Sequence, residues 1–258
     1  MARSGLEVQH AVIKALFMRE IKTRFGKYRL GYLWAVLEPA AHLMVMVGIF
    51  GYVVHRTMPD ISFPVFLVNG IIPYFMFSDI TNRSISAIEA NKGLFNYRPV
   101  KPIDTVLARA FLEFFIYLFA YVTLMIILWL LGENISFPNV SMLILTWVLL
   151  LIFSSSVGVI FMVIGSSFPE TEKFLPIIIK PFYFISCVMF PLHAVPKDYW
   201  PYLLWNPIVH VVELTRASVV IGYSSEGVSL SYLFMVTLTI SFISLLLYSY
   251  REEKMLTS

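Results

Sequence analysis

Three residues that could do chemistry recur at helical spacing in an apolar run near the start of the chain. Trp34, Glu38 and His42 lie four residues apart, so they share one face of a helix. A charge near the middle of a bilayer costs roughly 2.5–3.5 kcal/mol, and it normally faces a helix bundle or a water-filled path. Two interpretations stay open: a transport path or gate, or a structural role in which Glu38 is hydrogen-bonded or wet.

Two further pairs of opposite charge also stand four residues apart. They are Asp79 with Arg83 and Arg109 with Glu113. Pairs at this spacing meet on one helix face. The sequence therefore favours ordinary ion pairs at helix ends over a reactive site.

A basic cluster precedes the first apolar run. It consists of Arg24, Lys27 and Arg29, and Tyr28 lies among them. Anionic lipid headgroups are a sufficient partner for such a cluster beside a membrane. The alternative hypothesis is that these three residues receive an anionic substrate headgroup at an entrance.

Several familiar chemical motifs are missing from the sequence. It has no G-x-x-x-x-G-K-[ST] phosphate loop, no G-x-S-x-G and no H-E-x-x-H, so ATP is not expected to be split by a phosphate loop of this chain. Its single cysteine, Cys187, cannot form an intrachain disulfide, and no metal-ligand spacing exists. No cofactor or metal is expected in this chain.

The elements that position these residues must lie in lipid. The chain has 258 residues, of which 59% are hydrophobic and 14% charged, and its mean hydropathy is +0.79. Soluble domains carry about 45–50% apolar residues and about 25% charged ones. A membrane helix needs about 20 mostly apolar residues. We therefore predict an all-α polytopic membrane protein with six spans, at residues 31–54, 63–82, 106–131, 142–168, 177–192 and 229–250.

The distribution of basic residues orients these spans. Lysines and arginines gather around residues 3–29, 83–109, 173 and 251–254, whereas the alternate segments hold Arg56, Lys197 and Arg216. Cytoplasmic segments are the ones enriched in lysine and arginine. We therefore predict an inner-membrane protein whose two termini both lie in the cytoplasm.

Residues 6–28 precede the first span and are predicted to form an amphipathic helix. Ile13, Leu16, Phe17 and Ile21 recur at helical spacing among basic residues. A helix of this kind lies on the cytoplasmic leaflet. The alternative is a soluble amphipathic helix that packs on a partner.

Two connecting segments are predicted to contain short helices. Residues 84–96 form the longest internal cytoplasmic connection, and two prolines at 99 and 102 follow them, so a short helix ended by a turn is expected. Residues 196–222 lie in the longest external loop and carry apolar pieces too short to cross. Short re-entrant helices that dip partway into the membrane fit this pattern.

Two stretches resemble a known family. The first runs from Arg19 through Leu30-Gly-Tyr-Leu-Trp34 to Glu38-Pro39, and the second comprises residues 191–196 and 205–210 with Glu213 and Arg216. Together they resemble the ABC-2 type permeases that export capsular polysaccharide in Gram-negative bacteria. Such permeases have the type V exporter fold and form homodimers. Each subunit docks a separate ABC ATPase, which binds the ATP and magnesium.

The resemblance also implies roles for particular residues. A substrate channel or gate would involve Trp34, Glu38, His42, Phe182, Tyr183 and Phe184. The coupling helix that contacts the ATPase, residues 84–96, would use Ser84, Ile88, Glu89, Lys92, Leu94, Phe95 and Asn96. An external lid would contain Trp205, Asn206, Pro207, His210, Glu213 and Arg216.

The cargo and partners follow from the same resemblance. The cargo would be a finished capsule polymer on a lipid anchor with an acidic linker. A periplasmic adaptor of the polysaccharide co-polymerase type and an outer-membrane polysaccharide exporter would carry it onward. No nucleic acid is expected as a partner.

Two other classes of protein remain as alternatives. An ion-coupled secondary transporter could use Glu38 as a proton site, but such proteins often contain inverted repeats, and we see none in the sequence. A membrane enzyme that modifies lipid-linked sugars should carry several ionised groups on its loops. The largest external loop offers few of them, namely Lys197, Asp198, Glu213, Arg216 and Glu226. Dependence on a partner ATPase separates the exporter from both alternatives.

Overall fold

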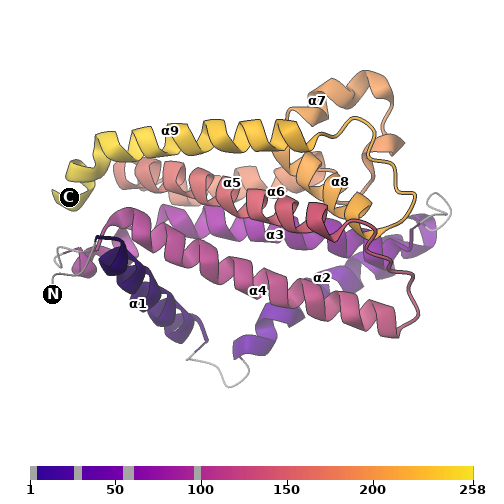
Figure 1. Ribbon diagram of the computed structural model, residues 1–258, viewed down its shortest axis with the longest axis horizontal. Coiled ribbons are helices and arrows are strands. Elements are labelled where there is room, and N and C mark those ends of the chain that lie inside the picture. The colour runs from indigo at the N-terminus through magenta and orange to yellow at the C-terminus, as the bar shows by residue number, and fades with distance from the viewer. Residues whose placement is uncertain (1–4, 26–30, 55–60, 96–99, 258) are drawn as a thin grey trace.

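The computed structural model describes residues 5–25, 31–54, 61–95 and 100–257, and in these ranges it contains helices and turns but no strand. The helices are α1 (Gly5–Phe25), α2 (Gly31–Val54), α3 (Phe63–Ile85), the 3₁₀ turn η1 (Glu89–Leu94), α4 (Pro102–Leu130), α5 (Val140–Ser167), α6 (Thr171–Ile185), η2 (Leu192–Ala194), η3 (Lys197–Tyr199), α7 (Trp200–Leu204), α8 (Pro207–Val219) and α9 (Leu230–Thr257). The long helices run side by side as a bundle (Figure 1).

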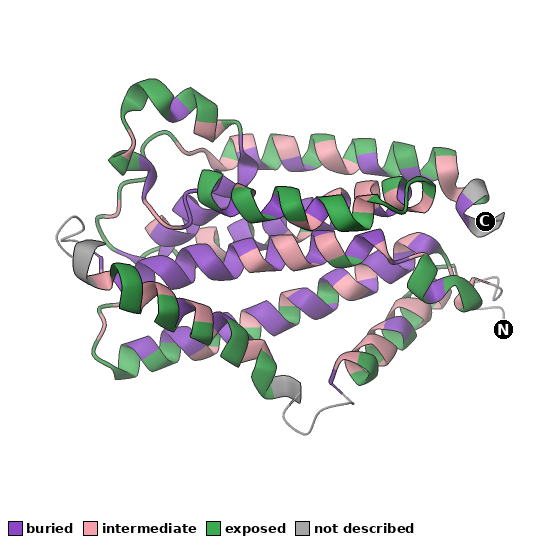
Figure 2. Cartoon of the chain, turned by 180° about the vertical axis from the view of Figure 1, so that it is seen from behind, coloured by how far each residue is buried: buried purple, intermediate pink, exposed green. Residues whose placement is uncertain are grey.

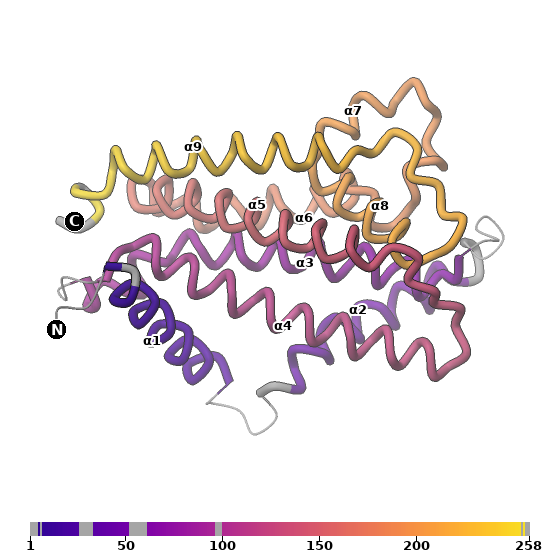
Figure 3. The backbone as a smooth tube through the Cα atoms, viewed as in Figure 1, coloured from indigo at the N-terminus to yellow at the C-terminus, as the bar shows by residue number. Residues whose placement is uncertain are grey.

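The two ends of the bundle differ. Both chain termini lie at one end, which we call the inner end, and α7 and α8 lie at the opposite, outer end (Figure 1). The helix α1 slants away from the inner end beside α4, as the tube view shows (Figure 3). The inner end and the outer end therefore bring together different parts of the chain.

The centre of the bundle is α3. It packs against α2, α4, α5, α6 and α8, and 17 of its residues are buried, more than in any other described helix. Close approach to α5 depends on glycine, because a Cβ on Gly158 would lie 2.5 Å from the Ser84 Oγ. A Cβ on Gly165 would lie 2.9 Å from the carbonyl oxygen of Ile85. Small residues therefore permit tight helix packing here.

Within the described ranges, five helices are long and apolar enough to cross a membrane: residues Leu33–Gly51, Phe63–Ile85, Pro102–Leu130, Val140–Ser167 and Leu230–Glu253. They correspond to predicted spans one, two, three, four and six, with ends shifted by up to four residues. Leucine and phenylalanine side chains on α2 and α9 stay exposed (Figure 2). In a bundle that lies in lipid, such side chains cost nothing.

The prediction for span five is wrong in its boundaries. The sequence predicts residues 177–192, but α6 comprises 15 residues, Thr171–Ile185, which is short of the about 20 that a full crossing needs. The helix ends at Ile185, Ser186 is its C-cap, and Cys187 has φ of 56°. A left-handed residue at this place commonly ends a helix, so the apolar residues beyond it lie outside α6.

The segment 84–96 also differs from its prediction of one coupling helix. Ser84 and Ile85 belong to α3, and the separate 3₁₀ turn η1 spans Glu89–Leu94. The Asn91 side chain donates to the carbonyl oxygen of Ala87 at 2.6 Å. The predicted helix is therefore divided between the end of α3 and a separate 3₁₀ turn, and Asn91 ties that turn to Ala87 between them.

The N-terminal helix α1 is attached to its own bundle. Its apolar residues Phe17, Ile21 and Phe25 pack with Leu112 and Ile116 of α4. The rings of Phe17 and Phe115 meet edge to face at 6.2 Å. The predicted helix at 6–28 is therefore present over Gly5–Phe25, with residues 26–28 outside the described ranges. Part of its apolar surface is covered by protein rather than by lipid.

Candidate functional site

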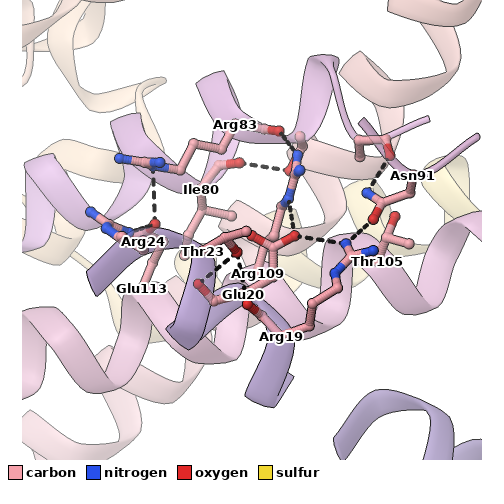
Figure 4. A network of polar contacts seen from close by, with 12 residues as sticks. Arg19, Glu20, Thr23, Arg24, Ile80, Arg83, Asn91, Thr105, Arg109 and Glu113 are labelled. Carbon is pink, nitrogen blue, oxygen red and sulfur yellow. Dashed lines mark hydrogen bonds and ion pairs between the residues drawn. The ribbon is translucent and has the colours of Figure 1, made fainter. Parts of the chain in front are cut away.

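The inner end contains a network of charged residues from α1, α3 and α4 (Figure 4). Its centre is Glu113, which is 1% exposed. One carboxylate oxygen, Oε1, accepts a hydrogen bond from Arg24 and forms an ion pair with Arg83, whose Nε lies 3.0 Å away. Asp79 lies 3.8 Å from Arg24 and accepts from the Tyr117 hydroxyl at 2.9 Å. Three helices thus share one set of charges, in which Glu113 is buried and Arg83 is exposed.

A second branch of the network reaches η1. Glu20 of α1 accepts from the Arg109 Nε at 3.2 Å, and the Arg109 Nη1 donates to the carbonyl oxygen of Arg83 at 2.6 Å. Arg19 donates to the side-chain oxygen of Asn91, which is 2% exposed. The helix α1 is therefore bonded both to α4 and to the turn that follows α3 (Figure 4).

This network differs from the two pairs that the sequence predicts. Asp79 and Arg83 do pair, at 3.9 Å. Among the described residues, however, Arg109 pairs with Glu20 and Glu113 pairs with Arg24 and Arg83. Residues about 89 positions apart in the chain replace the expected neighbours. Spacing along one helix could not reveal these contacts.

A polar cavity of about 260 Å³ lies within this network and is lined by Glu20, Thr23, Arg24, Arg83, Ser86, Arg109, Leu112 and Glu113. The Glu113 Oε2 is buried and accepts no hydrogen bond from any described residue. Arg24, one of three predicted headgroup residues, is already paired with two carboxylates. The other two, Lys27 and Arg29, lie outside the described residues.

A second, mostly apolar groove of about 520 Å³ runs between α2, α3 and α6. The Nε2 of His42 lies 3.2 Å from the Tyr183 hydroxyl. Tyr74 donates to the carbonyl oxygen of Ile179, and its ring meets that of Tyr183 at 5.1 Å. Phe184 also lines this groove. The side chains of three helices therefore form an aromatic surface with a few polar tips.

The remaining predicted channel residues are placed differently. Phe182 is half-buried and packs against Phe77 and Trp205 rather than lining the groove. Trp34 and Glu38 are exposed on α2. The charge of Glu38 acts on Arg83, so Glu38 lies beside the inner network. The stripe of Trp34, Glu38 and His42 thus runs from that network to the groove.

The outer end contains a fully buried ion pair on α8. Arg216 is 0% exposed, and its Nη1 lies 2.8 Å from the Glu213 Oε1. Its guanidinium also donates to the carbonyl oxygens of Phe66, Cys187 and Val188, at 3.3, 2.8 and 2.7 Å. A fully paired buried arginine of this kind fixes its neighbours in one geometry.

The backbone around Arg216 is shaped to receive it. A Cβ on Gly70 would lie 2.7 Å from the Arg216 Nη2, and the guanidinium carbon lies 3.5 Å from the Phe66 ring centroid. Glu213 also accepts from the Leu192 N–H at 3.3 Å and from the Tyr223 hydroxyl at 2.8 Å. These bonds join α8 to α3 and to the chain that leaves α6.

The other predicted lid residues begin α8. Asn206 caps the helix by accepting from the Ile208 N–H at 2.9 Å, and Pro207 occupies its first turn, where proline is favoured. The His210 Nε2 donates to the carbonyl oxygen of Leu204 at 2.8 Å, and its Nδ1 accepts from the Ser229 N–H at 3.0 Å. Burial lowers the pKa of His210, so its neutral form is favoured. Trp205 alone among the predicted lid residues is exposed, at 60%.

The predicted coupling residues are unequally accessible. Ser84 is buried and donates to the carbonyl oxygen of Ile80 at 2.6 Å, so a partner could not reach it. Glu89 and Lys92 are exposed, whereas Ile88, Leu94 and Phe95 are half-buried. Asn96 lies outside the described residues.

The sequence interpretation missed several residues of these sites. Asn91 and Tyr74 were not singled out, and neither lies in a recognisable motif. A buried asparagine next to exposed neighbours gives no periodic signal. A signal for Tyr74 does exist, because Asn69 and Pro73 interrupt the apolar run that contains it, and polar interruptions of a membrane helix often mark functional positions.

A family model described as an ABC-2 type transporter matches residues 11–220 of this chain. The match covers most of the sequence, and the chain therefore belongs to the ABC-2 type transporter family. The predicted family and all-α membrane architecture are confirmed, which argues against the two alternative classes.

Three individual proteins resemble the chain over most of its length. The chain is 66% identical to the polysialic acid transport protein KpsM of Escherichia coli over 258 residues, the whole length of both. It is 30% identical over 225 residues to the capsule polysaccharide export inner-membrane protein CtrC of Neisseria meningitidis, covering 87% of this chain and 83% of the relative. Over 232 residues it is 29% identical to BexB of Haemophilus influenzae, which has the same description.

Proposed function

We propose that this chain is the membrane-spanning permease subunit of an ABC transporter that exports capsular polysaccharide across the bacterial inner membrane. The observation that carries the proposal is the 66% identity, over the full length of both chains, to a protein described as a polysialic acid transporter. Helices long and apolar enough to span a membrane support it. The cargo is a polymer on a lipid anchor.

The energy for export comes from a separate subunit. An ABC ATPase binds ATP and magnesium and docks at the inner end, which lies in the cytoplasm with both termini. The exposed side chains of Glu89 and Lys92 on η1 support this docking surface. Movement of η1 reaches α1 through Arg19 and Asn91, and it reaches α4 through Glu20 and Arg109.

The path of the polymer runs along the groove between α2, α3 and α6. Aromatic faces offer apolar contact to sugar rings without fixing one sugar in place, and His42, Tyr183 and Phe184 supply such a surface. Two copies of the chain face each other across this path. The exposed carboxylate of Glu38 supports this arrangement, because a charge on a membrane helix favours a wet path over lipid.

The acidic headgroup of the cargo is received near the inner end. Arg24, Lys27 and Arg29 are the candidates for this step, with Arg24 facing the polar cavity. Beyond the inner membrane, a periplasmic adaptor of the co-polymerase type and an outer-membrane exporter carry the polymer onward.

The location of the polymer in a strain that lacks this protein tests the proposal. Capsule polymer should be made and trapped in the cytoplasm, and the unaltered protein should restore it to the surface. A Glu38→Ala variant should restore export less well than it restores protein level. Absence of any polymer would instead indicate a role in synthesis, and normal surface polymer would rule out this cargo.

A further inference from the structure

The groove between α2, α3 and α6 contains a lysine whose charge has no partner in the described part of the chain. Lys180 is exposed on α6 and lines this groove. It forms no ion pair or hydrogen bond with any described residue. Apart from His42, the other described lining residues are apolar, aromatic or hydroxyl side chains, and none of them is a carboxylate. A single ammonium group therefore faces a mostly apolar surface.

Lys180 lies near the middle of the bundle. His42 lies midway along the 24 residues of α2, and Tyr74 lies midway along the 23 residues of α3. The Tyr74 hydroxyl donates to the carbonyl oxygen of Ile179, the residue before Lys180. At 1.5 Å per residue, about 14 Å of helix separates Lys180 from the start of α6 at Thr171. At this depth a charge favours a water-filled path over lipid.

The acidic residues of α2 and α3 do not supply the missing partner. Asp79 lies 3.9 Å from Arg83, and the charge of Glu38 acts on the same arginine. Both carboxylates therefore lie beside the inner network, and neither lines the groove. An acidic group that meets Lys180 must come from outside the described part of this chain.

The backbone of α6 beside Lys180 also favours a hydrated surface. Pro181 follows Lys180 inside the helix, and because proline has no N–H it cannot bond the carbonyl group of Ile177. Ile177 is 65% exposed and stands one helical turn from Lys180, so the two residues share one face of α6. In a membrane, such backbone is tolerated where it is buried in protein or lines a water-filled cavity. Charge and backbone thus both suit the passage of a polar molecule.

We propose that Lys180 selects acidic polymers in this groove. Its ammonium group binds the carboxylate of one sugar, while the aromatic faces of Tyr183 and Phe184 contact the sugar rings beside it. Lysine suits this task because its ammonium is a compact charge on a flexible stem, so it can release one carboxylate and meet the next.

This inference rests on the proposed function and names the class of cargo, a polysaccharide that carries carboxylates. The 66% identical relative is described as a polysialic acid transport protein, and each sugar of that polymer bears one carboxylate. The charge of Lys180 is complementary to such a chain.

Binding of a matched pair of ligands tests the charge. Purified, full-length protein in lipid discs is mixed with oligosialic acid, and separately with the same oligomer after its carboxylates are converted to amides. We expect the unaltered protein to bind the acidic form at least about tenfold more tightly, a difference of about 1.4 kcal/mol. Lys180→Gln should weaken binding of the acidic form alone, and unchanged binding of the amide shows that this variant is folded. Lys180→Arg should keep the preference.

Lys173 provides a matched control on the same helix. It is exposed and lies near the start of α6, and it does not line the groove. Lys173→Gln removes the same charge, so it should leave the preference for the acidic form unchanged. Equal loss of the preference in both glutamine variants, or no preference in the unaltered protein, would overturn the proposal. If Lys180→Gln instead converted paired copies to single ones in light scattering, Lys180 would belong to the contact between copies, and the proposal would also fail.

Export in cells separates this inference from the proposed function. Lys180→Gln should leave the protein level normal, lower surface polymer severalfold and retain polymer in the cytoplasm, and Lys180→Arg should export normally. Normal surface polymer in the strain that lacks the protein would refute the proposed function. Normal export by Lys180→Gln, in a strain that otherwise retains its polymer inside, would refute only the role of Lys180.

Discussion

Two charged residues at the outer end, Arg216 and Glu213, are buried and depend on each other. Arg216 and Glu213 are enclosed together, with 0% and 1% of their surfaces exposed. Each is a charge removed from water, and it is stabilised by its partner and by backbone groups. Their value to the protein lies in geometry, since a buried pair fixes one arrangement of α3, α8 and the chain after α6.

Replacement of Arg216 by methionine should destabilise the protein by about 3–5 kcal/mol, because Glu213 would remain as a buried, unpaired charge. Thermal unfolding of the purified variant measures this loss. The double variant Arg216→Met/Glu213→Leu should recover part of the stability, since it removes both charges. A single variant as stable as the unaltered protein would contradict the assigned role.

His210 makes the stability of the outer end depend on pH. Its pKa in the folded protein is lowered from its usual 6.5 by burial, and its Nδ1 accepts a hydrogen bond that protonation would remove. The unfolded chain therefore binds the proton more readily. The stability from this residue is complete above pH 6.5 and is lost as pH falls toward the lower folded-state pKa.

Unfolding temperatures measured from about pH 8 to about pH 5 should show this loss. A His210→Gln variant should be less stable at neutral pH but less sensitive to acid. The exposed His193 is a matched control, because His193→Gln should leave the pH dependence unchanged. An identical acid response in both variants would assign the effect to other groups.

At the scale of elements, α1 and η1 are joined to the bundle by polar bonds. Arg19 holds Asn91, and Glu20 holds Arg109. The exposed and buried residues of η1 therefore have different tasks. Glu89 faces outward, whereas Asn91 is 2% exposed and holds the turn in shape.

Variants of these two residues should separate docking from folding. Glu89→Arg should weaken association with the partner ATPase, and hence export, while protein level stays normal. Asn91→Ala should lower both, because it removes the bonds of Asn91 to the Ala87 carbonyl and to Arg19, which would keep its pair with Glu20, at a cost of about 1–3 kcal/mol. Copurification of the ATPase and membrane protein level are the two measurements. Unchanged copurification with Glu89→Arg would exclude this docking surface.

At the scale of the whole molecule, α2 is the least covered of the long helices, with 11% of its apolar window buried. It carries Glu38 on an exposed face. A lipid-exposed carboxylate would be costly, roughly 2.5–3.5 kcal/mol. A second copy of the chain across a wet path would relieve this cost.

Crosslinking between copies tests this arrangement. Leu37→Cys on α2 and Leu238→Cys on α9 place thiols at sites of similar exposure, 44% and 51%. We expect copies with Leu37→Cys to crosslink in membranes and copies with Leu238→Cys to remain separate, because α2 carries Glu38 on its exposed face and α9 presents apolar residues that suit lipid. The buried Cys187 should not interfere. Crosslinks at Leu238→Cys alone would place the contact between copies on α9.

The sequence by itself predicted the family from two motifs. It also predicted the membrane class and, within the described residues, five helices that are long enough to span, because an apolar run of about 20 residues has few other stable states. The end of α6, which Cys187 follows with a positive φ, and the 3₁₀ form of η1 are seen only in the tertiary structure. The pairing of Glu113 with Arg24, and of Arg216 with the backbone of α3, joins residues far apart in the chain. Only tertiary packing brings such groups together, since the range of a hydrogen bond is short and spacing along the chain carries no record of it.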